Sequence, residues 1–264
     1  MLSNLRRLLR YRGLIQSLVA RELKARYRGS VLGFFWSFVN PLLLLLIYTF
    51  VFTTVLAGTR PANIEPYALF LFSGILPWTW FSSSLSEAAG SLISGGNLIK
   101  KVLFPAEILP LVSVLANMVH FFLGLPILVA FLVIYRHPPD LLDLFWFPVT
   151  VAVQLVFTAG LALILSALAV HFRDIRDILA NLLTFWFFAT PIIYPMEMAP
   201  SLARTLLNLN PFTHLAVSYQ EILFYQGAIG HWKWLLALGF ASVLLFFAGY
   251  FLFDRLRDSF AEEV

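Results

Sequence analysis

Residues 34–57 read FFWSFVNPLLLLLIYTFVFTTVLA, an unbroken stretch without a charged side chain. A helix needs about 20 predominantly apolar residues to cross the roughly 30 Å hydrocarbon core of a bilayer. Apolar segments of this kind recur along the chain, which predicts six transmembrane helices. They are expected at Phe34–Ala57, Pro66–Ala88, Ile108–Tyr135, Phe145–Val170, Ile178–Tyr194 and Trp232–Phe253.

The composition indicates the same class of protein. Of the 264 residues 60% are hydrophobic and only 12% are charged, and the mean hydropathy is +0.85. Soluble domains carry about one quarter charged residues, and disordered chains are far less apolar. The apolar runs are continuous, whereas strands of a membrane barrel alternate. We therefore predict an all-α integral membrane protein. The chain has no cysteine, which excludes disulfides, thiolate metal sites and cysteine nucleophiles.

The distribution of Lys and Arg predicts the orientation. With the N-terminus inside, the inner segments hold Arg6, Arg7, Arg10, Arg12, Arg21, Lys24, Arg26, Arg28, Lys100, Lys101, Arg173, Arg176, Arg255 and Arg257, and the outer ones hold Arg60, Arg136, Arg204 and Lys233. Basic residues concentrate in cytoplasmic segments. Both termini are thus expected in the cytoplasm, with the chain in the inner membrane. The net charge of +4 is assigned to orientation and anionic lipid, not to nucleic acid.

The N-terminal segment, residues 1–33, precedes the six-span domain, residues 34–264. Within it, apolar residues recur at helical spacing between basic ones over residues 4–28, which favours an amphipathic helix in the cytoplasmic interface. A basic tail that only sets orientation is the alternative. The candidate interface residues are Arg21, Glu22, Lys24 and Arg26.

The segment between the last two spans, Met196–His231, carries too many polar side chains for a helix that faces lipid. Irregular backbone is tolerated in a membrane only where protein or water covers it. We expect an external re-entrant segment of two short helices, broken at Asn210-Pro211. One additional span is the alternative, but it would move Arg255 and Arg257 to the outer side.

The sequence lacks the common catalytic motifs. No Gly is followed by Lys, so there is no P-loop, and neither HExxH, GxSxG nor GxGxxG occurs. His120 is the only titratable side chain expected well inside a span, as a functional group or as a satisfied interior one. No catalytic residue, metal ligand or cofactor is therefore assigned to this chain.

Two of the expected inner connections contain residues that a simple loop does not need. Residues 95–105, GGNLIKKVLFP, combine two helix-releasing glycines with apolar residues that would face water unless a partner covers them. Residues 171–177, HFRDIRD, alternate Arg and Asp, and serve either as a structural turn or as a contact with a soluble subunit.

Several motifs together resemble the ABC-2 type permeases that export polysaccharides such as O-antigen, capsule or teichoic acid. They are RELKARYRGSVLGFFW at 21–36, Asn40-Pro41, KKVLFP at 100–105, FRDI at 172–175, TPIIYP at 190–195 and Asn210-Pro211. Their order and spacing match along essentially the whole chain.

The resemblance implies a homodimer that carries two copies of a separate, soluble ATPase subunit, which would hold ATP and Mg²⁺. The segment Asn97–Pro105 would be a coupling helix, and the re-entrant pair would gate the outer side. The expected coupling residues are Asn97, Leu98, Lys100, Lys101, Leu103, Phe104, Pro105, Arg173 and Asp174.

The resemblance also implies that lipid-linked polysaccharide passes through a pore between the two subunits, lined mainly by the first and fifth spans. Aromatic rings suit this path because they stack on sugar rings without a fixed register. Lipid-facing bulk is the alternative role for such rings. The expected glycan-path residues are Phe35, Trp36, Tyr48, Phe185, Trp186 and Tyr194.

Two other functions fit the composition less well. An ion-driven secondary transporter typically shows internal repeats or mid-membrane acids, and no repeat is found. A membrane-embedded glycan-processing enzyme needs clustered acids or a metal site, and the sequence contains neither pattern.

Overall fold

A computed structural model describes residues 11–55, 64–100, 104–136, 144–172, 174–225 and 229–263. In these ranges the regular structure is entirely helical, as predicted. Five helices are long and apolar enough to cross a membrane: Gly33–Phe50, Tyr67–Ser94, Ile108–Ile134, Trp146–His171 and Trp232–Ser259. The chain is therefore an all-α membrane protein.

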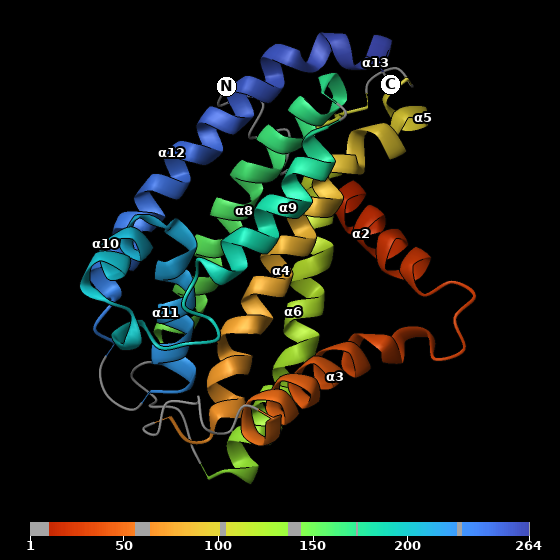
Figure 1. Cartoon of the computed structure of the whole chain (residues 1–264). Helices are drawn as coiled ribbons and strands as arrows, with labels where there is room; N and C mark the ends of the chain where they lie inside the picture. Colours follow the sequence, from red (N-terminus) through yellow and green to blue (C-terminus); the bar gives the residue numbers. More distant parts are fainter. Residues whose placement is uncertain are drawn as a thin grey trace.

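The elements follow one another in chain order and keep the labels of Figure 1. They are α2 (Arg12–Arg26), η1 (Gly33–Phe35), α3 (Trp36–Phe50), η2 (Val51–Val55), α4 (Tyr67–Ser94), α5 (Gly96–Ile99), α6 (Ile108–Ile134), α8 (Trp146–His171), α9 (Ile175–Phe188), η4 (Met196–Met198), α10 (Ser201–Leu209), α11 (Pro211–Leu223), α12 (Trp232–Leu256), η5 (Arg257–Ser259) and α13 (Phe260–Glu263).

The expected fifth span is shorter than the others. The sequence predicts it at Ile178–Tyr194, but α9 has 14 residues and ends at Phe188. At 1.5 Å per residue this helix is roughly 21 Å long, less than the roughly 30 Å of a bilayer core. Pro191 and Pro195 follow, and both disfavour continuation of a helix. The count of six spans thus remains a prediction.

Helix α4 forms the centre of the molecule (Figure 1). It packs against α3, α6, α8, α9 and α11, and 83% of its most apolar window is buried. Phe81 illustrates this packing, because its ring contacts Phe157 of α8, Trp186 of α9 and Phe212 of α11 at centroid distances of 5.7, 5.2 and 4.6 Å. Helix α4 therefore contacts most of the other long helices directly.

Helices α8 and α12 approach each other closely enough to require glycine. A Cβ added to Gly249 would lie 2.6 Å from the carbonyl oxygen of Gly160, and one added to Gly160 would lie 2.9 Å from the backbone nitrogen of Phe246. Small residues at helix contacts in membranes permit such approach. The two glycines thus allow α12 to lie along α8. Helix α12 and helices α2 and α3 are on opposite sides of α4 (Figure 1).

The segment after α9 forms two short helices, α10 and α11, that meet at Asn210. The backbone of Asn210 is extended, and its side-chain oxygen accepts a 3.0 Å hydrogen bond from the backbone N–H of Phe212. This is N-cap geometry with Pro211 at the first helical position. Helix α11 is buried against α4, α8 and α12.

The connections that follow α4 and α8 lie at the opposite end of the bundle from α10 and α11 (Figure 1). There α13 contacts α5 and α8. A hydrogen bond of 3.0 Å between His171 Nε2 and Ser259 Oγ ties the end of α8 to η5, which follows α12. Leu18 of α2 packs on Ile108 and Val112 at the start of α6. The segments with the largest basic charge therefore share one end.

Candidate functional site

A groove of about 640 Å³ lies between α3, α4 and α9. Its walls mix hydroxyl groups with aromatic rings. The hydroxyl groups belong to Thr79, Ser82, Ser83, Ser86 and Thr184, and the rings belong to Tyr48, Trp78, Phe187 and Phe188. Such a surface combines hydrogen-bonding groups with flat apolar rings.

Of the six aromatic residues expected along a glycan path, Tyr48 lines this groove and Trp36 lines an adjoining cavity. Phe35 and Phe185 lie outside both and are 69% and 71% exposed. Phe187 and Phe188 line the groove instead of their neighbours in sequence. The sequence marked the aromatic run at 185–188, but not which of its rings turn toward α4.

Trp186 and Tyr194 have structural partners. The indole Nε1 of Trp186 donates to Asn210 Oδ1 over 2.6 Å, and its ring packs edge-on against Phe81. The Tyr194 hydroxyl donates a 3.0 Å bond to the carbonyl of Phe188. Both rings hold the turn after α9 in place.

The outer faces of α3 and α9 leave large apolar side chains uncovered. On α9 these are Ile178, Leu182, Phe185 and Phe188, and on α3 they are Leu42, Leu43, Leu46, Ile47 and Phe50, all at least 37% exposed. The two faces flank the groove. A single copy of the chain thus presents the groove between two apolar rims.

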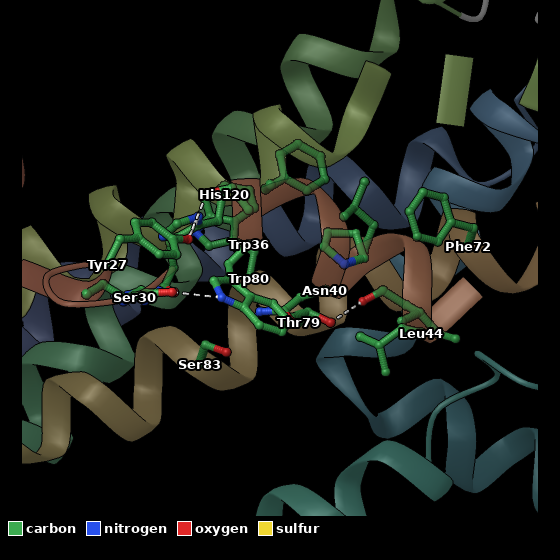
Figure 2. A pocket seen from close by; sticks show the side chains of 17 residues that line it. Tyr27, Ser30, Trp36, Asn40, Leu44, Phe72, Thr79, Trp80, Ser83 and His120 are labelled. Atoms are coloured by element: carbon green, nitrogen blue, oxygen red, sulfur yellow. Dashed lines mark hydrogen bonds between the residues drawn. The ribbon is translucent and has the colours of Figure 1, made fainter. Parts of the chain in front are cut away.

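A second cavity, of about 390 Å³, continues from the groove between α3, α4 and α6 (Figure 2). Four residues line both spaces: Leu44, Ile75, Thr79 and Ser83. Figure 2 shows a polar end, with Tyr27, Ser30 and His120, and an apolar end, with Leu44 and Phe72. We call this space the side cavity.

The polar end of the side cavity is built on an ion pair that links three helices. The Arg26 guanidinium donates to the two carboxylate oxygens of Glu87 at 2.7 and 2.8 Å, and to Asn117 Oδ1 at 3.1 Å. Asn117 Nδ2 donates in turn to Glu87 over 2.7 Å. The side chains of Arg26 and Glu87 are 27% and 35% exposed. The end of α2 is thereby fastened to α4 and α6.

This ion pair corrects two expectations. Arg26 was expected among the residues of the interface helix, but its guanidinium pairs with Glu87 and Asn117 inside the bundle. His120 was expected to be the only titratable group well inside a span, but α4 continues to Ser94 and so encloses Glu87 as well. An acidic residue at the next-to-last position of the predicted segment 66–88 was the available signal.

A chain of hydrogen bonds holds His120 beside the ion pair. Ser37 Oγ donates to the Tyr27 hydroxyl over 2.7 Å, and that hydroxyl lies 3.2 Å from His120 Nδ1. The Tyr27 hydroxyl therefore lies between Ser37 Oγ and His120 Nδ1 and links the two side chains. His120 Nε2 is buried and has no partner among the described residues.

The expected coupling segment forms the short helix α5 and the chain that leads into α6. Asn97 and Lys100 are exposed, whereas Leu98 and Phe104 are partly buried. Leu98 packs against a cluster that includes Tyr250 and Phe253 of α12. Phe104 contacts that cluster and the one formed by Leu18, Ile108 and Val112. Pro105 is buried.

Phe104 therefore packs within the chain instead of projecting freely. Lys101, Leu103 and Arg173 lie outside the described residues. Asp174 is exposed at the N-cap of α9. Beside α5, a hollow of about 840 Å³ is bordered by Arg21 and Glu22 of α2, Asn97, Leu98 and Arg176. Lys24 is exposed on α2.

Comparison with known proteins adds a family to this geometry. The profile of the ABC-2 type transporter family matches residues 13–224. An O-antigen export system permease of Myxococcus xanthus is 44% identical over the full length of both chains. One of Klebsiella pneumoniae is 34% identical over 92% of this chain and 91% of its own. A polysialic acid transport protein of Escherichia coli is 23% identical over 78% and 80%. The family match covers well over half of the sequence, from α2 through α11, and so the chain belongs to the ABC-2 type transporter family.

Proposed function

We propose that this chain is the membrane subunit of an exporter that moves lipid-linked polysaccharide, most specifically O-antigen, across the cytoplasmic membrane. The observation that carries this proposal is the 44% identity to a protein named as an O-antigen export permease, over the full length of both chains. The groove between α3, α4 and α9 supports it, because hydroxyl groups and rings suit a polymer of sugar units.

The exporter is proposed to work as a homodimer. The groove is open on one side and bordered by uncovered apolar residues of α3 and α9. Contact between two such rims would bury apolar surface and close two grooves around one path. Twofold pairing is the commonest symmetry of homo-oligomers.

Export is proposed to be driven by ATP hydrolysis on a separate subunit that binds ATP and Mg²⁺. This chain contains no P-loop motif, so a conformational change must enter through a contact with that subunit. The surface around α5, with the exposed Asn97 and Lys100 and the adjoining hollow, is the candidate contact. Asp174, at the start of α9, lies on the other inner connection.

The orientation and the outer gate complete the proposal. Both termini are placed in the cytoplasm because basic residues are concentrated in the expected inner segments. Helix α9 and the turn that follows would complete a sixth crossing. Helices α10 and α11 would form the outer gate, since α11 is buried beside α4 and α10 exposes three leucines.

The test is reconstitution of export in cells. The chain is expressed with the ATPase and glycan-synthesis genes of its own host in a strain that lacks an O-antigen exporter, and surface glycan is measured with a glycan-specific antibody. We expect surface glycan with the intact ATPase and none with an ATPase inactivated at its P-loop lysine. Glycan that remains inside with the active ATPase would contradict the proposed function.

The coupling surface is tested in the same cells. Asn97→Trp should reduce co-purification of the ATPase in detergent and reduce export in parallel, because a bulky ring is placed on an exposed contact residue. Asn181→Trp, at an exposed position of α9, serves as the matched change away from α5 and should retain the ATPase. Equal binding of the ATPase by wild type and Asn97→Trp would place the contact elsewhere.

A further inference from the structure

The side cavity contains polar groups that the fold itself does not use. The exposed amide of Asn40 and the half-buried hydroxyl of Ser83 line it, and neither forms a hydrogen bond with any described residue. His120 Nε2, at the polar end, is buried and also unpartnered. Buried polar groups usually have partners, so the buried and unpartnered His120 Nε2, with two further free polar groups on the same cavity, points to a ligand there.

The remaining lining specifies the shape of that ligand. The rings of Trp36, Trp80 and Phe121 border the cavity. Trp36 is held in place because its Nε1 donates a 2.9 Å bond to Ser30 Oγ, and Trp80 is held by a 3.1 Å bond to the carbonyl of Val114. Fixed rings next to free polar groups favour a molecule with a flat apolar face and a hydroxylated edge. The volume of about 390 Å³ falls within the range of small-molecule sites.

The charge of the cavity specifies an uncharged ligand. Arg26 is the only cationic residue in the lining, and its guanidinium is already compensated by both oxygens of Glu87. Asn117 joins the two and occupies further hydrogen-bonding capacity of each. An acidic group would therefore lose its hydration without gaining an unpaired cation.

The position of the cavity connects it to the groove. The two spaces share wall residues, namely Leu44, Ile75, Thr79 and Ser83. A polymer that lies in the groove can therefore insert one of its sugar units into the side cavity. We propose, on the basis of the function proposed above, that the side cavity binds an uncharged sugar unit of the exported glycan. The site would then discriminate among glycans by the charge of the unit that it admits.

The binding test uses the full-length protein in lipid nanodiscs and saturation-transfer NMR, with a neutral mannose trisaccharide as the probe. We expect saturation transfer to the neutral probe and none to a sialic acid trisaccharide of the same length. Asn40→Leu, which removes the free amide at nearly constant size, should weaken binding roughly five- to ten-fold, the loss expected when one or two hydrogen bonds are removed. Asn181→Leu on α9 is the matched control and should bind like wild type.

A second variant protects the test against a folding defect. Trp36→Leu removes a ring from the cavity wall without entering the wall of the groove, and should also weaken binding of the mannose trisaccharide. Both variants must elute as wild type does in size-exclusion chromatography. Undiminished binding by both variants, or equal saturation transfer to the acidic probe, would overturn the proposal.

The export assay separates failure of this inference from failure of the proposed function. If the wild type binds the neutral probe through Asn40 but exports no glycan, the proposed function is contradicted. The side cavity would then still be a sugar-binding site, with a different role. A wild type that exports glycan, with Asn40→Leu and Trp36→Leu binding and exporting equally well, would overturn only the side cavity.

Discussion

Trp186 and Asn210 are joined by a 2.6 Å hydrogen bond from the indole Nε1 to the amide Oδ1, which ties α9 to the break between α10 and α11. The same amide caps α11 at Phe212, and its nitrogen donates to the carbonyl of Ala189 and to Thr190 Oγ1, each at 2.9 Å. One side chain thus satisfies the end of one helix and the start of another. The residue at the break between α10 and α11 therefore also fixes the position of that break.

The first prediction follows from this connection. Asn210→Ala removes a helix cap and three further hydrogen bonds, and we expect a loss of about 2–4 kcal/mol in stability. Trp186→Phe removes the indole bond and part of the ring that packs on Phe81, and should cost about 1–3 kcal/mol. Thermal unfolding in one detergent, followed by fluorescence, compares the two. Equal midpoints for wild type and Asn210→Ala would show that the amide network does not stabilise the segment.

The break between α10 and α11 could be located from the sequence, but the residues that Asn210 contacts could not be predicted. Asn-Pro marks a break because Pro211 cannot donate to the preceding turn and suits the first position of a helix. Which ring of the aromatic run at 185–188 meets Asn210 depends on the rotation of α9 about its own axis. That rotation is set by packing on α4. Neighbouring Phe and Trp residues are similarly apolar, so the sequence does not show which of them packs there.

The side cavity was hidden from the sequence for a related reason. Apolar length predicts a span and basic residues predict its orientation, and both are properties of one segment. The Arg26–Glu87 pair joins residues 61 positions apart, and only the packing of α2 beside α4 and α6 brings them together. Asn40 was marked by its motif, but its free amide depends on how α3 crosses α4.

The second prediction concerns the ion pair itself. A double-mutant cycle of Arg26→Gln and Glu87→Gln should give a coupling free energy of about 1–2 kcal/mol, because the pair is partly exposed and shares Asn117. Glu87→Gln alone should be more harmful than the double variant, since it leaves the Arg26 cation without its counter-charge. Thermal midpoints of the four proteins give the cycle. Additive effects of the two single changes would refute the pair as a fastening of α2.

The third prediction is that the stability of the protein depends on pH through a pair of histidines on α11 and at the start of α12. His214 Nδ1 and His231 Nε2 are 2.8 Å apart, and His214 Nε2 lies 3.0 Å from the carbonyl of Asn208. The carboxylate of Glu221 faces them through the backbone N–H of His231, and Trp234 stacks on His214. Burial lowers the pKa of His214. Burial and then the neighbouring His214 lower the pKa of His231 to about 4.

The sign of the effect follows from these lowered pKa values. Between pH of about 6.5 and about 4 the unfolded chain binds more protons than the folded one, so this contribution to stability is complete above the unfolded pKa and declines with acidification. We expect a lower thermal midpoint at about pH 5 than at about pH 7.5. His231→Gln, which keeps a donor for His214, should reduce that difference. An undiminished pH dependence in His231→Gln would assign it to other groups.

The last prediction tests whether α9 meets a second copy of the chain. Phe185 is 71% exposed on the rim of the groove, and Phe240 of α12 is 70% exposed, so the two are equally apolar and equally uncovered in one copy. The chain has no cysteine, and a single cysteine at either position is therefore the only thiol. If the rims of α3 and α9 pair across a twofold axis, Phe185→Cys should form a disulfide-linked dimer when membranes are oxidised, since bridged Cα atoms lie within about 7 Å. Phe240→Cys, whose helix lies on the far side of α8, should remain a monomer on a non-reducing gel.

Cysteines at Ile178, Leu182 and Phe188, on the same face of α9 as Phe185, allow for a twofold axis that passes nearer to another turn of that helix. A dimer that is linked through Phe240→Cys and through none of the four α9 positions would show that the copies pair by α12, and the groove would then have to open toward lipid instead of toward a partner.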